Sequence, residues 1–167
     1  MKRLQPYLRR HEPSGPQFST SLKSGFGAFL GIAAAGGLAS LTELPFLLAP
    51  FGATAVLVFG QPASALAQPV NVIGGYAIGA ATAALLMTSF PGAWLAAAIG
   101  VGVAITLMLA LRLTHPPAGA IPIMAATSPL APTALMEVVI GGSILMIALA
   151  AIHHRIPPRQ HYPRPID

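Results

Sequence analysis

The stretch from Thr114 to Ala120 holds the residues best suited to chemistry. His115 stands directly before Pro116 and Pro117, and Ala118, Gly119 and Ala120 follow. Because consecutive prolines are not accommodated inside a helix, this order predicts that His115 lies on extended backbone just before a short helix. A helix N-terminus offers free N–H groups and partial positive charge, and an imidazole adds a hydrogen bond or a titratable charge. The segment therefore suits a small anion, with bracing of a chain break by His115 as the alternative.

The same pattern occurs 67 residues earlier. One shift aligns Pro50-Phe51-Gly52-Ala53 with Pro117-Ala118-Gly119-Ala120, Pro62 with Pro129, and residues 72–75 with 139–142. Five of the seven Gly and Pro residues between positions 50 and 77 recur, where chance predicts about one. This predicts an internal two-fold repeat. Phe51, Gly52, Ala53 and Thr54 would then form the second half of the anion site, unless the Thr54 hydroxyl bonds back to its own helix.

The composition predicts a membrane protein. The chain of 167 residues is 54% hydrophobic and 8% charged, with a mean hydropathy of +0.72, which is too little charge to coat a soluble globule. Lys and Arg flank the apolar middle, with Arg112 as the exception. By the positive-inside tendency both termini face the cytoplasm and the expected location is the inner membrane. These flanking charges indicate the lipid bilayer rather than nucleic acid as a partner. Without cysteine, thiolate metal sites are excluded, and no metal or cofactor is predicted.

Four long apolar segments have the length of membrane-spanning helices, namely 22–41, 70–90, 93–111 and 134–152. We therefore expect an all-α membrane domain over residues 22–152, in two repeats of about 22–90 and 93–152. Residues 1–21 and 153–167 are expected to be cytoplasmic tails, the first basic and the second rich in Pro and Arg. Four long helices make a thin wall around a pathway, which leaves room for a homo-oligomer.

Two shorter segments, Leu44–Gly60 and Leu113–Ser128, each carry the repeated Pro-x-Gly-Ala break. Each is expected to be an extended stretch that feeds a half-helix, turned toward the interior because lipid does not satisfy irregular backbone. If they re-enter, the chain crosses four times and the repeats are parallel. If they cross, there are six crossings and inverted repeats, with Arg112 inside and Glu43 outside. Charge placement favours the second arrangement.

Four further polar residues are candidates near the site. We expect Gln68 and Asn71 to cap the helix that begins near residue 70 and to bond the neighbouring break, with substrate contact as the alternative. Arg112 either draws anions to the entrance or anchors the chain at the interface. Glu137 is expected in the first turn of the last helix, inward or at the interface, where it could carry protons together with His115.

The chain resembles the HPP family of integral membrane proteins. The resemblance covers about residues 20–153, at 48–57, at 68–75 and at His115-Pro116-Pro117, the motif that names the family. It implies four transmembrane helices and, through members associated with nitrite transport, a pathway for a small anion.

Together these observations predict a channel or carrier for a small inorganic monovalent anion, with nitrite favoured. The alternative is a non-transporting membrane scaffold or sensor. Transport of a neutral or cationic solute is disfavoured because Glu137 is the main candidate for an inward carboxylate. No motif predicts an enzyme.

Overall fold

The computed structural model describes residues 18–91, 93–127 and 130–165, and these residues contain helices and no strands. The α-helices are α1 (Phe18–Thr42), α2 (Ala49–Ala55), α3 (Pro69–Ser89), α4 (Trp94–Ala110), α5 (Ile121–Thr127) and α6 (Pro132–His153). A π-helical segment, Val56–Gly60, continues α2, and a 3-10 segment, Pro116–Ala120, leads into α5. A further 3-10 turn spans Ala65–Ala67.

The four long apolar segments are helical as predicted, within a few residues at each end. Three of them, α1, α3 and α6, are long and apolar enough to cross a membrane, whereas α4 has 17 residues and is shorter. Most of the predicted basic tail, residues 1–17, lies outside the described residues, and its last four residues already belong to α1. α6 ends at His153, where the Pro-rich segment begins.

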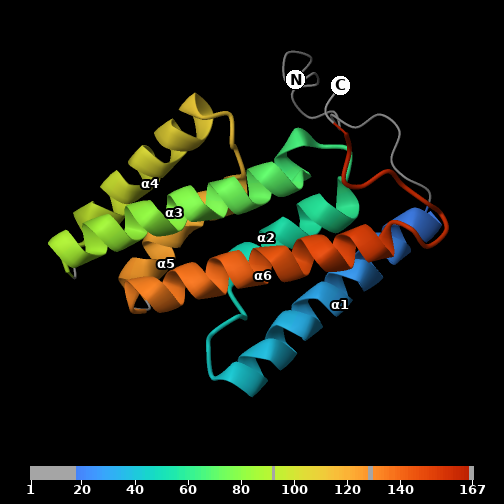
Figure 1. The fold of residues 1–167 in the computed structure, drawn as a ribbon, viewed down its shortest axis with the longest axis horizontal. Coiled ribbons are helices and arrows are strands. Elements are labelled where there is room, and N and C mark those ends of the chain that lie inside the picture. Colours follow the sequence, from blue (N-terminus) through green and yellow to red (C-terminus); the bar gives the residue numbers. More distant parts are fainter. Residues whose placement is uncertain (1–17, 92, 128–129, 166–167) are drawn as a thin grey trace, which may run out of the picture.

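The bundle has two distinct ends. α1 begins where α6 ends, since Lys23 donates hydrogen bonds to the carbonyls of Ile156 and Pro158, and Gly27 packs against the His153 ring. We call this the tail end, and the opposite one the far end. α3 starts at the tail end, because the backbone N–H of Arg164 donates to Gln68 Oε1 at its N-terminus (Figure 1).

Both short segments consist of an extended lead-in and a half-helix, as predicted. Leu48, before α2, has φ −96° and ψ 137°, and His115, before Pro116, has φ −136° and ψ 98°. The prolines occupy the first turn of each helix, where a missing N–H costs nothing. The half-helices run in opposite directions from the middle of the bundle. α2 and its π-helical extension run to the tail end, while α5 runs to the far end (Figure 1).

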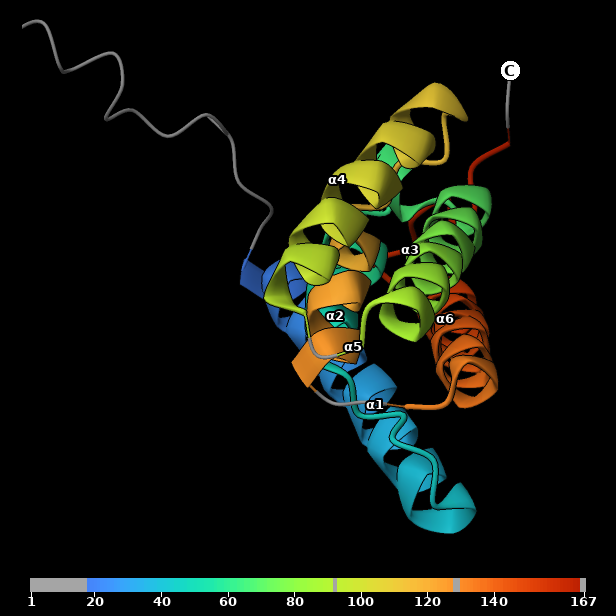
Figure 2. The same ribbon diagram turned by 90° about the vertical axis from the view of Figure 1, so that its left-hand side faces the viewer.

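The chain therefore traverses the bundle at each short segment instead of returning to the end it came from. α3 and α6 lie side by side, α2 and α5 pack against them, and α1 and α4 diverge on the outer side (Figure 2). Phe51, Phe59, Tyr76 and Met146 are among the fully buried side chains at the centre of this packing.

Glycines 67 residues apart make reciprocal contacts between the two halves. A Cβ placed on Gly75 would lie 2.6 Å from the Cβ of His115, and one on Gly142 would lie 2.3 Å from the Phe51 ring. Gly74 and Gly141 repeat the relationship, with 2.9 Å to Leu113 and 3.2 Å to Phe46, two residues that are also 67 apart. Each long helix thus receives the broken segment of the other half against a glycine pair, because a side chain there would fill the contact.

The end of α4 directs the chain into the second break. Arg112 adopts φ 57°, its N–H donates to the Leu109 carbonyl, and the N–H of Leu113 donates to the Met108 carbonyl at 2.9 Å. These two bonds with a left-handed residue form a Schellman motif, which ends a helix and satisfies its last carbonyls. The motif places Leu113 against Gly74 and leaves His115 beside Gly75.

Candidate functional site

His115 lies at the junction of the two broken segments and is fully buried. Its Nε2 is 2.9 Å from Oγ1 of Thr54 on α2, and its Nδ1 is 2.8 Å from the Leu66 carbonyl oxygen in the 3-10 turn. Both ring nitrogens are therefore hydrogen-bonded. The structure joins the two predicted half-sites directly, through side chains 61 residues apart in the sequence.

Tyr76 completes this junction, although the sequence analysis did not single it out. Its hydroxyl lies 2.8 Å from Thr54 Oγ1, and its ring packs edge-on against Phe51 with centroids 5.4 Å apart. The Tyr76 ring also lies beside that of His115, at 5.2 Å between centroids. One available signal was a tyrosine directly after the repeated Gly74-Gly75 pair in an otherwise apolar span. We call Thr54, Tyr76 and His115 the junction triad.

Thr54 does not bond back to its own helix. The structure gives its hydroxyl to Tyr76 and His115, and all three side chains of the junction triad are buried. Burying three polar groups among apolar side chains is costly unless they bond one another, and here each does. The triad is thus a satisfied polar cluster inside an apolar bundle.

The backbone groups of the predicted anion cradle are arranged differently from the expectation. The N–H of Phe51 donates to the Leu48 carbonyl at 3.0 Å, and the N–H of Ala118 donates to the His115 carbonyl at 3.0 Å. Those two amides are paired and do not point freely at a shared volume. Phe51, Pro117 and Ala118 are buried, whereas Gly52, Ala53, Pro116 and Ala120 are exposed and Gly119 is half-buried.

Asn71 bonds the neighbouring break as expected, and Gln68 does not cap α3. The Asn71 side chain donates to the Thr114 carbonyl at 3.2 Å, one residue before His115. Gln68 is the N-cap residue of α3, but its side-chain amide donates to the carbonyls of Pro62 and Ser64 instead. Gln68 thereby orders the turn whose Leu66 carbonyl holds His115.

Arg112 and Glu137 lie apart from the junction triad. Both are exposed. Glu137 is the sixth residue of α6 and stands in its second turn, so its predicted first-turn position is wrong, and its carboxylate is not turned inward. Arg112 occupies the turn after α4, where its main-chain role in the Schellman motif is clear.

A second polar cluster, which the sequence analysis did not foresee, closes the tail end. His154 Nε2 donates to the Val58 carbonyl at 2.7 Å, and the Tyr162 hydroxyl donates to the Ala67 carbonyl at 3.0 Å. Burial lowers the pKa of His154, with Lys23 acting in the same direction, and burial raises the pKa of the Tyr162 phenol. The C-terminal segment therefore folds back on the bundle and rests on the turn next to Leu66.

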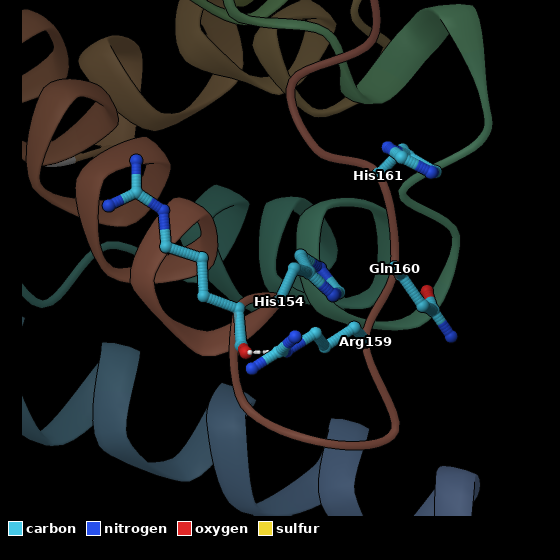
Figure 3. Close-up of a pocket in the computed structure, with 5 residues that line it drawn as sticks. His154, Arg159, Gln160 and His161 are labelled. Atoms are coloured by element: carbon cyan, nitrogen blue, oxygen red, sulfur yellow. Dashed lines mark hydrogen bonds between the residues drawn. The ribbon is translucent and has the colours of Figure 1, made fainter.

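A pocket of about 420 Å³ lies in this C-terminal segment (Figure 3). It is lined by His154, Arg155, Arg159, Gln160 and His161. Arg159 Nε donates to the Arg155 carbonyl at 3.0 Å, so this cation satisfies the backbone that follows α6. Among the described residues, no three His, Asp or Glu side chains gather in a way that could hold a metal ion.

The comparisons with known proteins agree with a membrane-embedded chain. The family described as HPP, transmembrane region, matches residues 13–163. One transmembrane protein of Dictyostelium discoideum is 33% identical over 129 residues, which are 72% of this chain and 42% of that protein. A second transmembrane protein of the same organism is 34% identical over 82 residues, which are 47% of this chain and 29% of that protein. The aligned regions thus span less than half of either relative. No solved structure matches.

Proposed function

Because this chain belongs to the HPP family of transmembrane proteins, we propose that it carries a small monovalent inorganic anion, with nitrite the first candidate, across the inner membrane. The observation that supports this most is the junction triad. Polar side chains deep inside a membrane domain are costly and usually functional. Here Thr54, Tyr76 and His115 come from three different elements and meet where the two broken segments meet.

The chemistry of the junction favours an anion over a cation. The triad consists of two hydroxyls and an imidazole, all of which can donate hydrogen bonds to an anion. The acidic residues that the structure describes, Glu43 and Glu137, are exposed, outside the triad. Neutral hydrogen-bond donors suit a small, weakly hydrated anion because they compensate for its lost water without trapping it.

The proposed topology is six crossings built from two inverted repeats. The reciprocal contacts of Gly75 with His115 and of Gly142 with Phe51 support it, as do the opposite directions of α2 and α5. Although α4 has 17 residues, it rises about 26 Å at 1.5 Å per residue, close to the thickness of the hydrocarbon.

The tail end is assigned to the cytoplasm. The C-terminal segment brings Arg155, Arg159 and Arg164 to this end, and Lys23 near the start of α1 binds it. This excess of cations fits the cytoplasmic side by the positive-inside tendency.

A homo-oligomer is proposed as the partner state. Gly52 is exposed on α2 and lines an apolar groove of about 510 Å³ with Phe29 and Ile32 of α1. A second copy, or lipid, would cover this face of the half-helix.

A non-transporting scaffold or sensor is the second candidate, and one observation favours it. Phe51, Thr54, Tyr76 and His115 are each 0% exposed, so the junction is packed closed in this conformation. A carrier must open it, whereas a scaffold keeps it closed.

Flux measurements separate the two candidates. The purified chain in proteoliposomes is expected to take up nitrite faster than empty liposomes, with nitrate, formate and chloride as the comparison panel. Gly102→Ala is the matched control, since nothing lies within 4 Å of a Cβ at that exposed position. Uptake equal to that of empty liposomes for all four anions would exclude anion transport and leave the scaffold.

A further inference from the structure

The hydrogen bonds of the junction triad have a fixed direction. A carbonyl oxygen only accepts, so the 2.8 Å contact with Leu66 requires the hydrogen on Nδ1 of His115. In the neutral ring Nε2 is then an acceptor, and it takes the hydrogen of the Thr54 hydroxyl at 2.9 Å. Thr54 Oγ1, having donated its hydrogen, accepts from the Tyr76 hydroxyl at 2.8 Å.

With neutral His115, every hydrogen of the triad is therefore used internally. Tyr76 donates to Thr54, Thr54 donates to His115, and His115 donates to Leu66. An anion that arrived at the junction would find no hydrogen free on these three groups. The neutral triad is a closed chain that does not bind an anion.

Protonation of His115 reverses this chain. The added proton sits on Nε2, which now donates to Thr54 Oγ1. The Thr54 hydroxyl rotates its own hydrogen toward the Tyr76 oxygen, and the Tyr76 hydroxyl rotates its hydrogen away from Thr54. No O–H bond breaks, and the single proton gained remains on the imidazole. The outcome is one hydroxyl hydrogen at Tyr76 that is free to donate to an anion.

The surroundings of His115 offer the imidazolium no other counter-charge. The groups that contact its ring are Thr54 of α2, Tyr76 of α3 and the Leu66 carbonyl, all uncharged. Arg112, three residues upstream, is itself cationic and exposed, and Lys23 and His154 lie at the tail end. A buried unpaired charge is strongly unfavourable, whereas a paired one is tolerated. A proton on His115 and an anion beside Tyr76 thus stabilise each other.

We propose that this chain moves a proton together with its anion, because protonation of His115 reverses the junction triad and releases the Tyr76 hydroxyl as the anion donor. This inference rests on the proposed transport function and adds its coupling ion. Proton and anion then enter together, with no net charge moved.

Proton movement in proteoliposomes tests the coupling. The lumen holds a pH-sensitive dye, and valinomycin with equal potassium on both sides holds the membrane potential at zero. An inward nitrate gradient is used beside the nitrite gradient, because nitrous acid crosses lipid unaided and nitric acid remains ionised. We expect nitrate or nitrite uptake to acidify the lumen by one proton per anion, after subtraction of empty liposomes. Anion uptake without acidification would overturn the coupling while leaving transport intact, and no uptake of any anion would overturn both.

Tyr76→Phe tests the donor specifically. Wild-type uptake is expected to rise about tenfold from pH 8 to pH 7, since the protonated fraction of a mostly neutral imidazole changes tenfold per unit. Tyr76→Phe keeps the ring and removes the released donor, so this acid stimulation is expected to disappear. Thr106→Val removes an exposed hydroxyl of α4 and is expected to keep it. Equal acid stimulation in all three proteins would overturn the proposal.

A spectroscopic measurement keeps the proposal testable if a variant fails to fold. Nitrogen-15 NMR of labelled histidine in the wild-type chain, assigned with His115→Gln, is expected to show the neutral Nδ1–H tautomer without anion. Addition of nitrate is expected to convert it to the imidazolium. An Nε2–H tautomer, or a neutral ring unaffected by nitrate, would contradict the reversal.

Discussion

Gly142 of α6 lies against the edge of the Phe51 ring so closely that an added Cβ would be 2.3 Å from two ring carbons. Gly75 of α3 stands in the same relation to His115, at 2.6 Å. The two glycines are 67 residues apart, and each accepts the broken segment of the other half. These contacts set the position of the junction triad, since Phe51 and His115 both pack on Tyr76.

Gly142→Ala is expected to destabilise the protein by about 1–3 kcal/mol, the usual cost of overpacking a well-packed core. The Phe51 ring is fully buried against Tyr76 and has no room to move aside. Thermal unfolding in detergent measures the effect. Gly102→Ala is the control and is expected to be neutral or stabilising, because alanine favours a helix over glycine by about 1 kcal/mol. Equal melting temperatures for the two variants would show that the close contact is not required.

Acid is expected to loosen the C-terminal segment. Because burial lowers the pKa of His154, the folded state holds it neutral, while the unfolded chain binds a proton near pH ~6.5. The stabilisation is present above that value and is lost as the pH falls below it. Wild-type melting temperature is therefore expected to drop between pH 8 and pH 5.

His154→Gln isolates this effect, since its amide can still donate to the Val58 carbonyl but does not titrate. The variant is expected to show a smaller drop in melting temperature than wild type over the same range. His161→Gln changes an exposed histidine and is expected to behave like wild type. An unchanged pH dependence in His154→Gln would refute this role.

The proposed topology predicts which end of the molecule each exposed charge occupies. The chain has no cysteine, so single cysteines report cleanly. Glu43→Cys and Glu137→Cys are expected to react with a membrane-impermeant maleimide from outside the cell. Arg112→Cys and Arg159→Cys are expected to react only after the cytoplasmic side is opened. Labelling of Arg112→Cys and Glu43→Cys from the same side would rule out six crossings with inverted repeats.

Much of the fold follows from the sequence because its helices are set by local features. Apolar length fixes α1, α3, α4 and α6, and the prolines of the two breaks fix where the half-helices begin. The 67-residue repeat identifies the two segments that meet. Pro and Gly act through backbone geometry, so their consequences are readable without knowledge of tertiary contacts.

The partners of individual side chains were less predictable. The sequence marks Thr54 and His115 as candidates, but their direct bond depends on how two half-helices pass each other. Tyr76 was missed because a tyrosine in an apolar helix is usually a packing residue, and its hydroxyl partner comes from α2. The return of the C-terminal segment depends on single long-range bonds, such as that of Tyr162 with Ala67. Such contacts leave no periodic pattern in the sequence.

The central claim is that a small anion passes through the junction of the two halves, and the Thr54 hydroxyl tests it most directly. Thr54→Ser keeps the bonds to Tyr76 and His115, whereas Thr54→Val leaves both without their partner at similar side-chain volume. With each variant confirmed as folded by its melting temperature, nitrite uptake in proteoliposomes is compared with wild type. We predict near wild-type uptake for Thr54→Ser and a loss of about tenfold or more for Thr54→Val, the effect expected when a buried polar partner worth roughly 1–3 kcal/mol is removed. Wild-type uptake in folded Thr54→Val would contradict the account, because the anion would then pass elsewhere.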